Sequence, residues 1–340
     1  MGGNGQGKTT LLEAAYYLCT TKSFYAKDID AVSFNNDEFE IKGHFKNNTD
    51  DFSRVYYSMA ENKKFYFQNE KLISRSLNII GKYPVVLLTP ADHSITQGSP
   101  SDRRKFIDSV ISQASGTYLS ILLDYNKTLK HRAAVLNRLK EFYSSQLISE
   151  LEAWTEKLVD NGVELINHRI SFINMFNAYL KDSYKEIMDK TESPAIKYSI
   201  SEKIEPELKK SFMDLLNEKR NEEIRRGVNL AGPHRDDFEF TINGISLKTF
   251  GSQGQHKTFQ AALRFAEFFY LKEITNKSPI FLLDDAFGEL DAHRAGRISS
   301  YLKKVGQAFV TITDFADFSF LKRSEDDLII KLHNGIYSYA

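Results

Sequence analysis

The 340 residues include only one cysteine, the residue that forms disulfides, and only seven prolines, which interrupt helices and strands. There is also a single tryptophan. One cysteine, Cys19, excludes an internal disulfide, and with it the small secreted scaffolds that disulfides hold together. Its apolar surroundings in the sequence predict a buried small hydrophobic residue in a reducing compartment. Apolar runs such as residues 85–88 are far shorter than the roughly 18 residues that cross a bilayer, and no charged-then-apolar leader opens the chain. We therefore expect a cytoplasmic protein without a membrane partner.

Net charge is also lacking. Lysine and arginine together number 45, as do aspartate and glutamate, so the whole chain favours no polyanionic partner and leaves only a local basic patch open. The apolar share of 41% and the charged share of 26% are those of a soluble globular protein, which excludes a disordered or fibrous one. At roughly 150 residues per domain, the length predicts two units, or one domain with a large insertion.

Changes in hydrophobic period divide the chain into three blocks. Residues 1–98 open with a glycine-rich loop and a helix, and then alternate as strands with one solvated face do. Residues 99–226 repeat with a helical period. From 227 to 340, strands return and alternate with helices, which predicts a parallel sheet. The alternating runs of the first block are residues 39–45, 54–59 and 64–68.

Two apolar stripes in the middle block predict a helical hairpin, with polar residues 144–146 near its turn. Such stripes are more typical of core packing than of a ligand site. The first stripe, with a seven-residue spacing, consists of Leu122, Leu129, Leu136 and Tyr143. The second consists of Leu151, Trp154, Leu158, Leu165, Ile173, Phe176 and Leu180.

The third block contains two hairpins and two buried strands. Each hairpin is predicted by an Asn-Gly turn, at residues 243–244 and 334–335. A helix over residues 256–274 precedes the apolar strand 279–283, and a further helix leads to the strand 308–313.

Basic residues exceed acidic ones between positions 101 and 140, where the only acidic residues are Asp102, Asp108 and Asp124. Two interpretations are open: a patch that binds the phosphate backbone of nucleic acid, or an ordinary solvated helix face. The basic residues are Arg103, Arg104, Lys105, Lys127, Lys130, Arg132, Arg138 and Lys140.

The sequence GGNGQGKT at residues 2–9 matches the phosphate-binding P-loop pattern at every fixed position, and a helix start follows it. Glycines allow backbone amides to turn toward phosphates, Lys8 reaches the β- and γ-phosphates, and the Thr9 hydroxyl ligates magnesium. The predicted phosphate-binding residues are Gly2, Gly3, Asn4, Gly5, Gln6, Gly7, Lys8, Thr9 and Thr10.

A P-loop normally follows a buried strand, whereas only Met1 precedes this one. This favours a truncated or misassigned amino terminus over a new design, because the loop would otherwise lack support at its entry.

An apolar strand ends at Asp284 and Asp285, and these two carboxylates predict the second half of a nucleotide site. Asp284 suits the magnesium ion or its water shell, and Asp285 would face the γ-phosphate and orient the attacking water. The alternative, two aspartates that cap a loop, is disfavoured by the P-loop elsewhere in the chain. The two ends of the chain must therefore meet in space.

Two further stretches resemble ABC-type ATPases. Ser252, Gly254 and Gln255 precede or begin a helix and resemble the Ser-x-Gly-Gln signature loop, which contacts the γ-phosphate of ATP on a second protomer. Residues 284–291 resemble a Walker B strand that runs into a D-loop ending at Asp291.

With these motifs, the chain resembles the RecF family of DNA replication and repair proteins, bacterial relatives of the SMC-type ATPases, nearly end to end. Besides the ATPase motifs, the stretches 88–92, 98–108, 231–237 and 252–258 are similar to that family. The resemblance implies an α/β fold: a P-loop ABC-type ATPase head with an antiparallel β subdomain and a helical insertion lobe. Residues 1–98 and 227–340 would form the two parts of the head, and 99–226 the lobe.

The resemblance also implies an activity. Members bind ATP and Mg²⁺, form an ATP-dependent homodimer that closes over DNA at single-strand gaps and duplex junctions, and hydrolyse ATP slowly. They work with the mediators RecR and RecO to help load RecA. In this reading the basic residues between 101 and 140 face DNA.

Some positions depart from the family pattern, since His256 stands where a second glutamine is common and Gly288 where serine is frequent. Asp285 replaces the catalytic glutamate of transporters, in agreement with slow turnover. Gln97 is the expected Q-loop sensor of magnesium, and Thr313 or Asp314 takes the place of the transporter switch histidine.

Two alternatives remain open at this stage: an ABC transporter subunit, and an inactive truncated ATPase that serves as a scaffold. Residues 234–236 also match the start of a kinase catalytic loop, but Thr241 replaces the required asparagine, which excludes a kinase. We expect this stretch to be a structural turn, near the nucleotide, with Arg235 and Asp236 as an ion pair.

Overall fold

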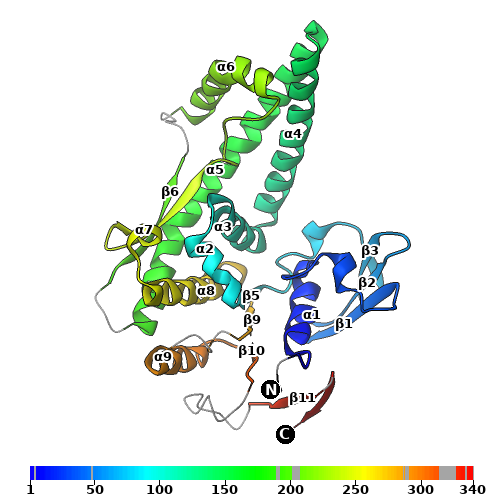
Figure 1. Ribbon diagram of the computed structural model, residues 1–340, viewed down its shortest axis with the longest axis vertical. Coiled ribbons are helices and arrows are strands. Elements are labelled where there is room, and N and C mark those ends of the chain that lie inside the picture. The colour runs from blue at the N-terminus through cyan, green and yellow to red at the C-terminus, as the bar shows by residue number, and fades with distance from the viewer. Residues whose placement is uncertain are drawn as a thin grey trace. The chain divides into compact units, whose positions relative to one another are not determined.

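The computed structural model describes residues 1–3, 5–46, 49–188, 192–200, 207–285, 287, 291–313, 327–333 and 335–339. The chain divides into two compact units, each built from separate segments of the sequence (Figure 1). The first unit comprises Met1–His93, Asp182–Thr191 and Gln253–Ala340, and the second comprises Ser94–Lys181 and Glu192–Ser252.

A parallel three-stranded sheet of order β10-β9-β5 forms the centre of the first unit. Its strands are β5 (Val85–Leu88), β9 (Ile280–Leu283) and β10 (Ala308–Val310). Because β5 is buried along its whole length, its sequence is an unbroken apolar run rather than an alternating one. The predicted parallel sheet is confirmed, although β10 ends earlier than the predicted strand.

Helix α1 (Lys8–Thr20) packs between this sheet and a second, antiparallel one. Cys19 lies in the cluster with Val85 and Leu282, so its predicted burial is confirmed, and burial raises the pKa of its thiol to about 12. On its other side α1 contacts Val55 and Tyr66. The second sheet is a meander of β1 (Glu38–Lys46), β2 (Asp50–Ser58), β3 (Lys63–Gln68) and β4 (Lys71–Ile73), as the alternating runs predicted.

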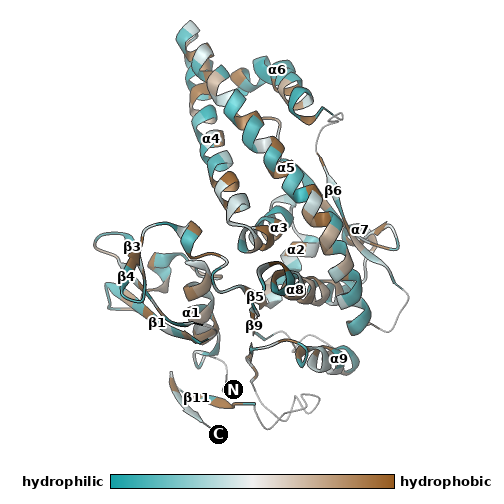
Figure 2. Cartoon of the chain, turned by 180° about the vertical axis from the view of Figure 1, so that it is seen from behind, coloured by the Kyte–Doolittle hydropathy of each residue, from teal (hydrophilic) through white to brown (hydrophobic). Residues whose placement is uncertain are grey.

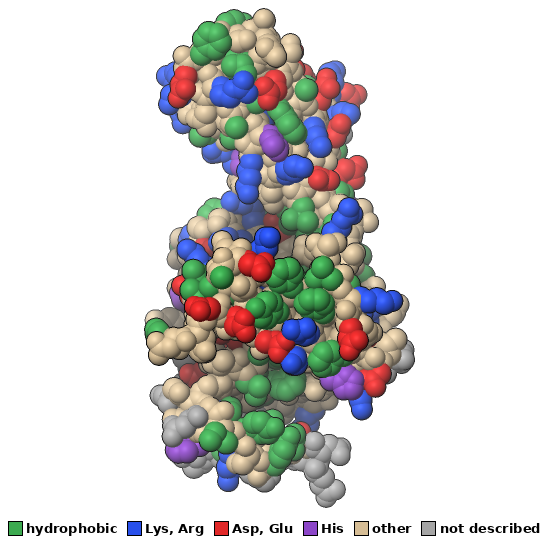
Figure 3. All heavy atoms as spheres, turned by 90° about the vertical axis from the view of Figure 1, so that its right-hand side faces the viewer, with side chains coloured by type: hydrophobic (Ala, Val, Ile, Leu, Met, Phe, Trp, Pro, Cys, Tyr) green, Lys and Arg blue, Asp and Glu red, His purple; other side chains and the backbone are tan. Residues whose placement is uncertain are grey.

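The outer face of the meander carries half-exposed aromatic residues. Figure 3 shows hydrophobic side chains gathered there among charged ones. Tyr56 and Phe65 stack with their centroids 6.2 Å apart, and the Arg54 guanidinium lies 5.1 Å from the centroid of Phe67.

Helices and a hairpin complete the first unit. Helix α8 (Gln253–Thr275) contacts β5, and the long helix α5 (Ser145–Ile187) ends in this unit. The remaining elements are α9 (Ala292–Leu302) and the predicted hairpin of β11 (Ile330–His333) and β12 (Ile336–Tyr339), besides short 3-10 helices at Asp28–Ala31, Ser76–Asn78 and Pro90–Asp92.

The second unit is mainly helical, and the predicted helical hairpin is α4 (Gly116–Glu141) followed by α5. Figure 2 shows hydrophilic and hydrophobic residues on different sides of these helices. A sheet of order β6-β7-β8 accompanies them. Besides α4 and α5, the second unit contains α2 (His93–Gln97, which begins in the first unit), α3 (Pro100–Ala114), β6 (Pro194–Ser199), α6 (Leu208–Arg226), β7 (Asp237–Ile242), β8 (Ile245–Ser246) and α7 (Leu247–Phe250).

Two details differ from the sequence-based expectation. The first stripe is not continuous: Leu136 is buried, whereas Tyr143 lies beyond the end of α4 and is 73% exposed. Residues 94–98 and 227–252, expected with the head, belong to the second unit, where β7 pairs with β6 and contacts α3. Residues 182–191, expected with the lobe, are grouped with the first unit. The second stripe packs in the core as predicted, since Leu158, Leu165 and Phe176 are fully buried. In the described part of the chain, no helix is long and apolar enough to span a bilayer.

Candidate functional site

The glycine-rich loop precedes α1 directly, as a P-loop should. Gly5 and Gly7 have φ values of 73° and 94°, a left-handed conformation that favours glycine. The loop is held at its entry by β11, because the backbone of Met1 bonds to Ile330 and Leu332 at 2.7 Å each. The first turn of α1 contains no acidic residue of its own, and the carboxylate that contacts this helix end is that of Asp284. Asn4 lies outside the described residues.

Lys8 folds back over its own loop. Its Nζ donates to the carbonyl oxygens of Gly2 and Gly3, at 2.5 and 2.8 Å. The ammonium group therefore lies within the loop that it is predicted to serve, and a phosphate could replace these two acceptors. Gln6 is half-buried in the loop, and Thr10 is exposed on α1.

Thr9 and Asp284 bring the two ends of the chain together, as predicted. The Thr9 hydroxyl lies 3.0 and 2.9 Å from the two carboxylate oxygens of Asp284, which is 3% exposed. Thr311, in the segment after β10, donates its hydroxyl to Asp284 Oδ1 at 2.8 Å. The same hydroxyl accepts the backbone N–H of Asp285 at 3.0 Å. Thr311 thus links both predicted carboxylate positions.

Asp285 is exposed and has a φ of 49°, so its backbone is in the left-handed region. Tyr25, in the loop after α1, faces the same carboxylates. Burial raises the pKa of the Tyr25 phenol, and the charge of Asp284, a hydrogen bond to it and the charge of Asp285 raise it further. The protonated phenol is therefore a donor to the Asp284 carboxylate.

The residues at this point fit a magnesium ion. Mg²⁺ prefers oxygen ligands, few of them from protein, together with substrate phosphates. A hydroxyl and a buried carboxylate that already touch, next to a loop for phosphates, supply that donor set. No group of three or more potential metal-binding His, Cys, Asp or Glu side chains occurs among the described residues, so a cage made of protein ligands alone is not found there.

The predicted signature residues begin α8. Ser252 is exposed just before this helix, while Gly254 and Gln255 lie in its first turn and are half-buried. The Thr258 hydroxyl donates to the Gly254 carbonyl at 2.9 Å. Asp291 caps the amino end of α9, where its Oδ1 accepts the backbone N–H of Arg294 at 2.9 Å.

Three side chains near these motifs escaped the sequence reasoning: Tyr25, Thr311 and Arg294. Thr311 had a detectable signal, since it is a hydroxyl residue in an apolar strand run, whereas the position of the transporter switch histidine predicted Thr313 or Asp314, two and three positions later. Thr313 is half-buried, and Asp314 lies outside the described residues. Gln97 is exposed at the end of α2 and belongs to the second unit.

The predicted basic patch is partly wrong. Arg132 is buried and its Nη2 donates to Glu223 Oε2 at 2.6 Å, while Arg103 is buried and holds Asp237 with two bonds of 2.8 Å. Arg104 donates to the backbone carbonyl of Asp236. These guanidinium groups hold the second unit together, because a buried charge needs an internal partner. The basic residues that remain exposed are Lys105, Lys127, Lys130, Arg138 and Lys140.

Residues 234–236 form a structural turn, as expected, but with other partners than predicted. Arg235 donates to the Asn229 carbonyl at 3.1 and 3.3 Å, and Asp236 accepts the phenol of Tyr198. The Tyr125 hydroxyl bonds His234 Nδ1 at 2.8 Å. The turn therefore joins α4, β6 and the residues before β7 within the second unit.

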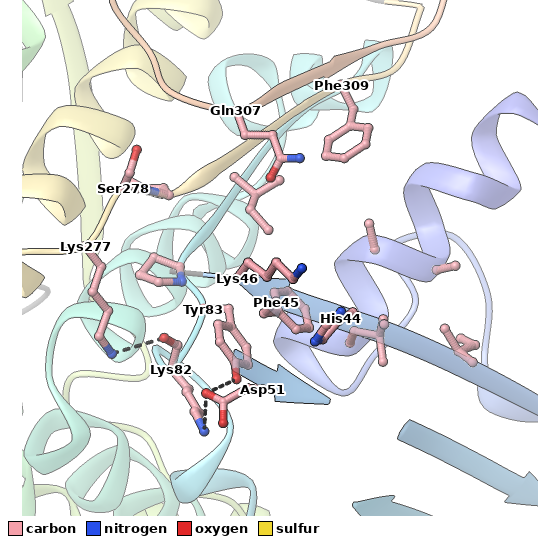
Figure 4. A pocket seen from close by; sticks show the side chains of 18 of the residues that line it. His44, Phe45, Lys46, Asp51, Lys82, Tyr83, Lys277, Ser278, Gln307 and Phe309 are labelled. Carbon is pink, nitrogen blue, oxygen red and sulfur yellow. Dashed lines mark hydrogen bonds and ion pairs between the residues drawn. The ribbon is translucent and has the colours of Figure 1, made fainter. Parts of the chain in front are cut away.

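A hollow of about 690 Å³ lies elsewhere in the first unit (Figure 4). Phe45 and Tyr83 stack 3.8 Å apart on its wall, the Tyr83 hydroxyl donates to Asp51 at 2.8 Å, and Lys277 reaches the Lys82 carbonyl at 3.0 Å. Lys8 and Asp284 are not among its lining residues, so this hollow is separate from the P-loop site.

The chain is similar to curated bacterial proteins along most of its length. It is 41% identical to the DNA replication and repair protein RecF of Chloroherpeton thalassium over 95% of this chain and 90% of that protein. RecF of Salinibacter ruber is 37% identical over 92% of this chain and 78% of its own length. No family model matches the sequence.

Solved structures give the same result. The structure titled recombination mediator protein RecF-ATPrS in the RecFOR pathway matches 99% of this chain and 90% of that one, with a TM-score of 0.87 and 30% identity. The Smc head domain from Pyrococcus furiosus matches with a TM-score of 0.54 and 16% identity, which shows a shared fold. The transporter alternative is not retained, and the chain belongs to the RecF family, the ABC-type ATPases of DNA replication and repair.

Proposed function

We propose that this chain binds ATP with Mg²⁺ between its P-loop and the end of β9, and that ATP joins two copies into a clamp on DNA. The observation that carries the proposal is the contact of the Thr9 hydroxyl with both oxygens of Asp284. Support also comes from the relatives, among them the structures titled RecF-ATP and RecF-ATPrS.

Within this site each residue has a distinct role. Lys8 exchanges the carbonyl oxygens of Gly2 and Gly3 for β- and γ-phosphate oxygens, because a charged acceptor binds an ammonium group more strongly than a carbonyl does. Thr9 and Asp284 would hold the magnesium ion, directly or through its water. The chemistry that bound Mg²⁺ supplies is the neutralisation of charge on the phosphate oxygens.

Asp285 orients the water that attacks the γ-phosphate. It is exposed beside buried Asp284, and the Thr311 hydroxyl holds its backbone. An aspartate stands here in place of the transporter glutamate, and we expect slow hydrolysis.

The second copy of the chain would contribute Ser252, Gly254, Gln255 and Asp291. Ser252 and the amino end of α8 offer a hydroxyl and a helix dipole to the γ-phosphate held by the other protomer. Hydrolysis would remove this bridging phosphate and release the dimer.

We further propose that the clamp acts in the cytoplasm at single-strand gaps and duplex junctions, with RecR and RecO, to help load RecA. Two relatives are titled as recombination mediators of the RecFOR pathway, which supports this assignment. The exposed lysines of α3 and α4 supply candidate contacts to phosphates.

Analytical ultracentrifugation on gapped DNA tests the proposal, with the parent chain and the variants Lys8→Ala and Ser252→Arg. The parent should dimerise with ATP but not without it. Lys8→Ala should lose ATP binding, whereas Ser252→Arg should keep it and lose dimerisation, because arginine blocks the place of the second protomer's phosphate. A parent that stays monomeric at saturating ATP, or a Ser252→Arg variant that dimerises normally, contradicts the clamp.

A further inference from the structure

Arg294 is fixed on one side by Asp291. Its backbone N–H and its Nη1 both donate to the Asp291 carboxylate, at 2.9 and 2.5 Å. The backbone hydrogen bond is the largest cause that lowers the pKa of Asp291, and the charge and side-chain hydrogen bond of Arg294 lower it further. The pKa therefore lies below its usual range, and the carboxylate stays charged. The guanidinium is thereby attached to the residue that ends the D-loop and begins α9.

The other side of the guanidinium lies against the first turn of α8. A Cβ atom at Gly254 would lie 2.8 Å from Arg294 Nη2, 3.0 Å from Nη1 and 3.2 Å from Cζ. Gly254 does not have a positive φ, so the glycine is not needed for its backbone conformation. Glycine also weakens a helix relative to alanine. A methyl group at this position would displace the guanidinium, so Gly254 leaves the space that Arg294 occupies in this structure.

Arg294 has donor capacity to spare. Its Nε is buried and has no hydrogen-bond partner among the described residues. The first turn of α8 contains no acidic residue that could neutralise the charge. A cation beside the amino end of a helix meets the positive end of the helix dipole, which costs free energy, and the ion pair with Asp291 offsets part of this cost.

We propose that Arg294 is a positioning residue that ties the end of the D-loop to the signature turn, so that the two motifs facing the second protomer's nucleotide hold one geometry. This inference rests on the ATP-dependent dimer proposed above. Arg294 acts through Gly254 and Asp291 and needs no contact with ATP bound to its own chain.

Four variants test this role: Arg294→Ala, Arg294→Lys, Gly254→Ala and the double variant Gly254→Ala/Arg294→Ala. Arg297→Ala is the matched control, because Arg297 lies on the same helix but its Nε donates to the Glu186 carbonyl at 2.8 Å. Two quantities are measured: the affinity for a fluorescent ATP analogue, and the dimer dissociation constant with ATP by analytical ultracentrifugation. Circular dichroism checks the fold of each variant.

ATP affinity, measured at protein concentrations where the chain is monomeric, should stay within about twofold of the parent in every variant, because Gly254 is proposed to meet only the ATP of the second protomer. Dimerisation should weaken about tenfold or more in Arg294→Ala and Gly254→Ala, and the double variant should be no worse than either one, because both lose the same contact. Arg294→Lys should stay impaired, since lysine keeps the charge but lacks the planar fork. Arg297→Ala should dimerise normally.

Several results would overturn the inference: an Arg294→Ala variant that dimerises like the parent, additive losses in the double variant, or full rescue by lysine. If the parent itself does not dimerise, the proposed clamp fails, and the contact is still tested by melting temperature without ATP. Gly254→Ala should then lower the melting temperature of the parent but not that of Arg294→Ala. Equal shifts in both backgrounds would exclude the contact.

Discussion

Thr9, in the first turn of α1, donates its hydroxyl to Asp284, 275 positions later at the end of β9. The P-loop and the Walker B carboxylate are therefore adjacent in the fold itself. Such preorganisation lowers the cost of binding, because neither group has to be brought from elsewhere.

The Thr311 hydroxyl bonds to Asp284 and Asp285, and the variant Thr311→Val tests what these bonds contribute to ATP hydrolysis. Valine has a similar shape but leaves Asp284 Oδ1 and the Asp285 N–H without this partner. We expect ATP hydrolysis to fall about 10- to 100-fold, as when a residue that orients a metal ligand is replaced. Steady-state hydrolysis and its magnesium dependence provide the measurement. Thr311→Ser keeps the hydroxyl and should remain close to the parent; equal losses in both variants would argue against this hydrogen bond.

Arg132 should matter for stability. It is 1% exposed and bonds Glu223, Thr155 and Asn229, so Arg132→Met leaves the fully buried Glu223 without its cation. We expect a loss of about 3 to 5 kcal/mol in the free energy of unfolding. Urea unfolding measures it.

Lys130→Met, on the exposed side of the same helix, is the control and should change the free energy of unfolding by less than about 0.5 kcal/mol. The double variant Arg132→Met/Glu223→Leu should be less destabilised than Arg132→Met alone, because it leaves no buried unpaired charge. A double variant that is less stable still would show that the cost comes from lost packing instead.

The free energy of unfolding should decrease as the pH falls below neutral, because of His234. Burial, and secondarily the charge of Arg235, lower the pKa of His234 from 6.5 to about 4. The unfolded chain therefore binds a proton between these values while the folded chain does not, so the stability that His234 contributes is complete above pH 6.5 and is lost as pH falls toward 4. The full contribution is about 3 kcal/mol. Urea unfolding across this range should show a smaller pH dependence for His234→Gln, and an unchanged slope would refute this origin.

The exposed lysines of α4 should contact DNA. Lys127→Glu/Lys130→Glu should weaken binding to gapped DNA and reduce the slope of log affinity against log salt by about 2, since each lost phosphate contact removes about 0.9. Fluorescence anisotropy at several salt concentrations measures this slope. Lys209→Glu/Lys210→Glu on α6 changes the net charge equally and serves as the control. The same loss in both pairs would mean that binding follows total charge rather than this face.

Local patterns predicted the elements of the fold well, because each depends on neighbouring residues. Alternation identified β1, β2 and β3. Asn-Gly identified the turn between β7 and β8, and the pairing of β11 with β12 agrees with the second hairpin, whose Asn334 lies outside the described residues. The heptad stripe failed at Tyr143, where the helix had already ended. A period specifies the face of a helix but not where the helix stops.

The basic residues show the limit of reading charge from sequence. Arg132 and Lys130 are two positions apart, yet one is buried in an ion pair and the other is exposed. The partner of Arg132, Glu223, lies 91 positions away, and no local sequence pattern predicts this ion pair. The sequence therefore located the excess of positive charge but could not divide it between the core and the surface.

By itself, the sequence determined the chemistry that this protein has available: a glycine-rich loop with Lys8 and Thr9, a strand that ends in two aspartates, and a Ser-x-Gly-Gln turn. Spacing along the chain specifies these motifs, because each acts through its own backbone. Only the tertiary structure decided which distant groups serve them. Thr311 at the carboxylates and Arg294 against Gly254 depend on atoms that meet through folding, and burial, rather than sequence distance, determines what each charge or hydroxyl can do.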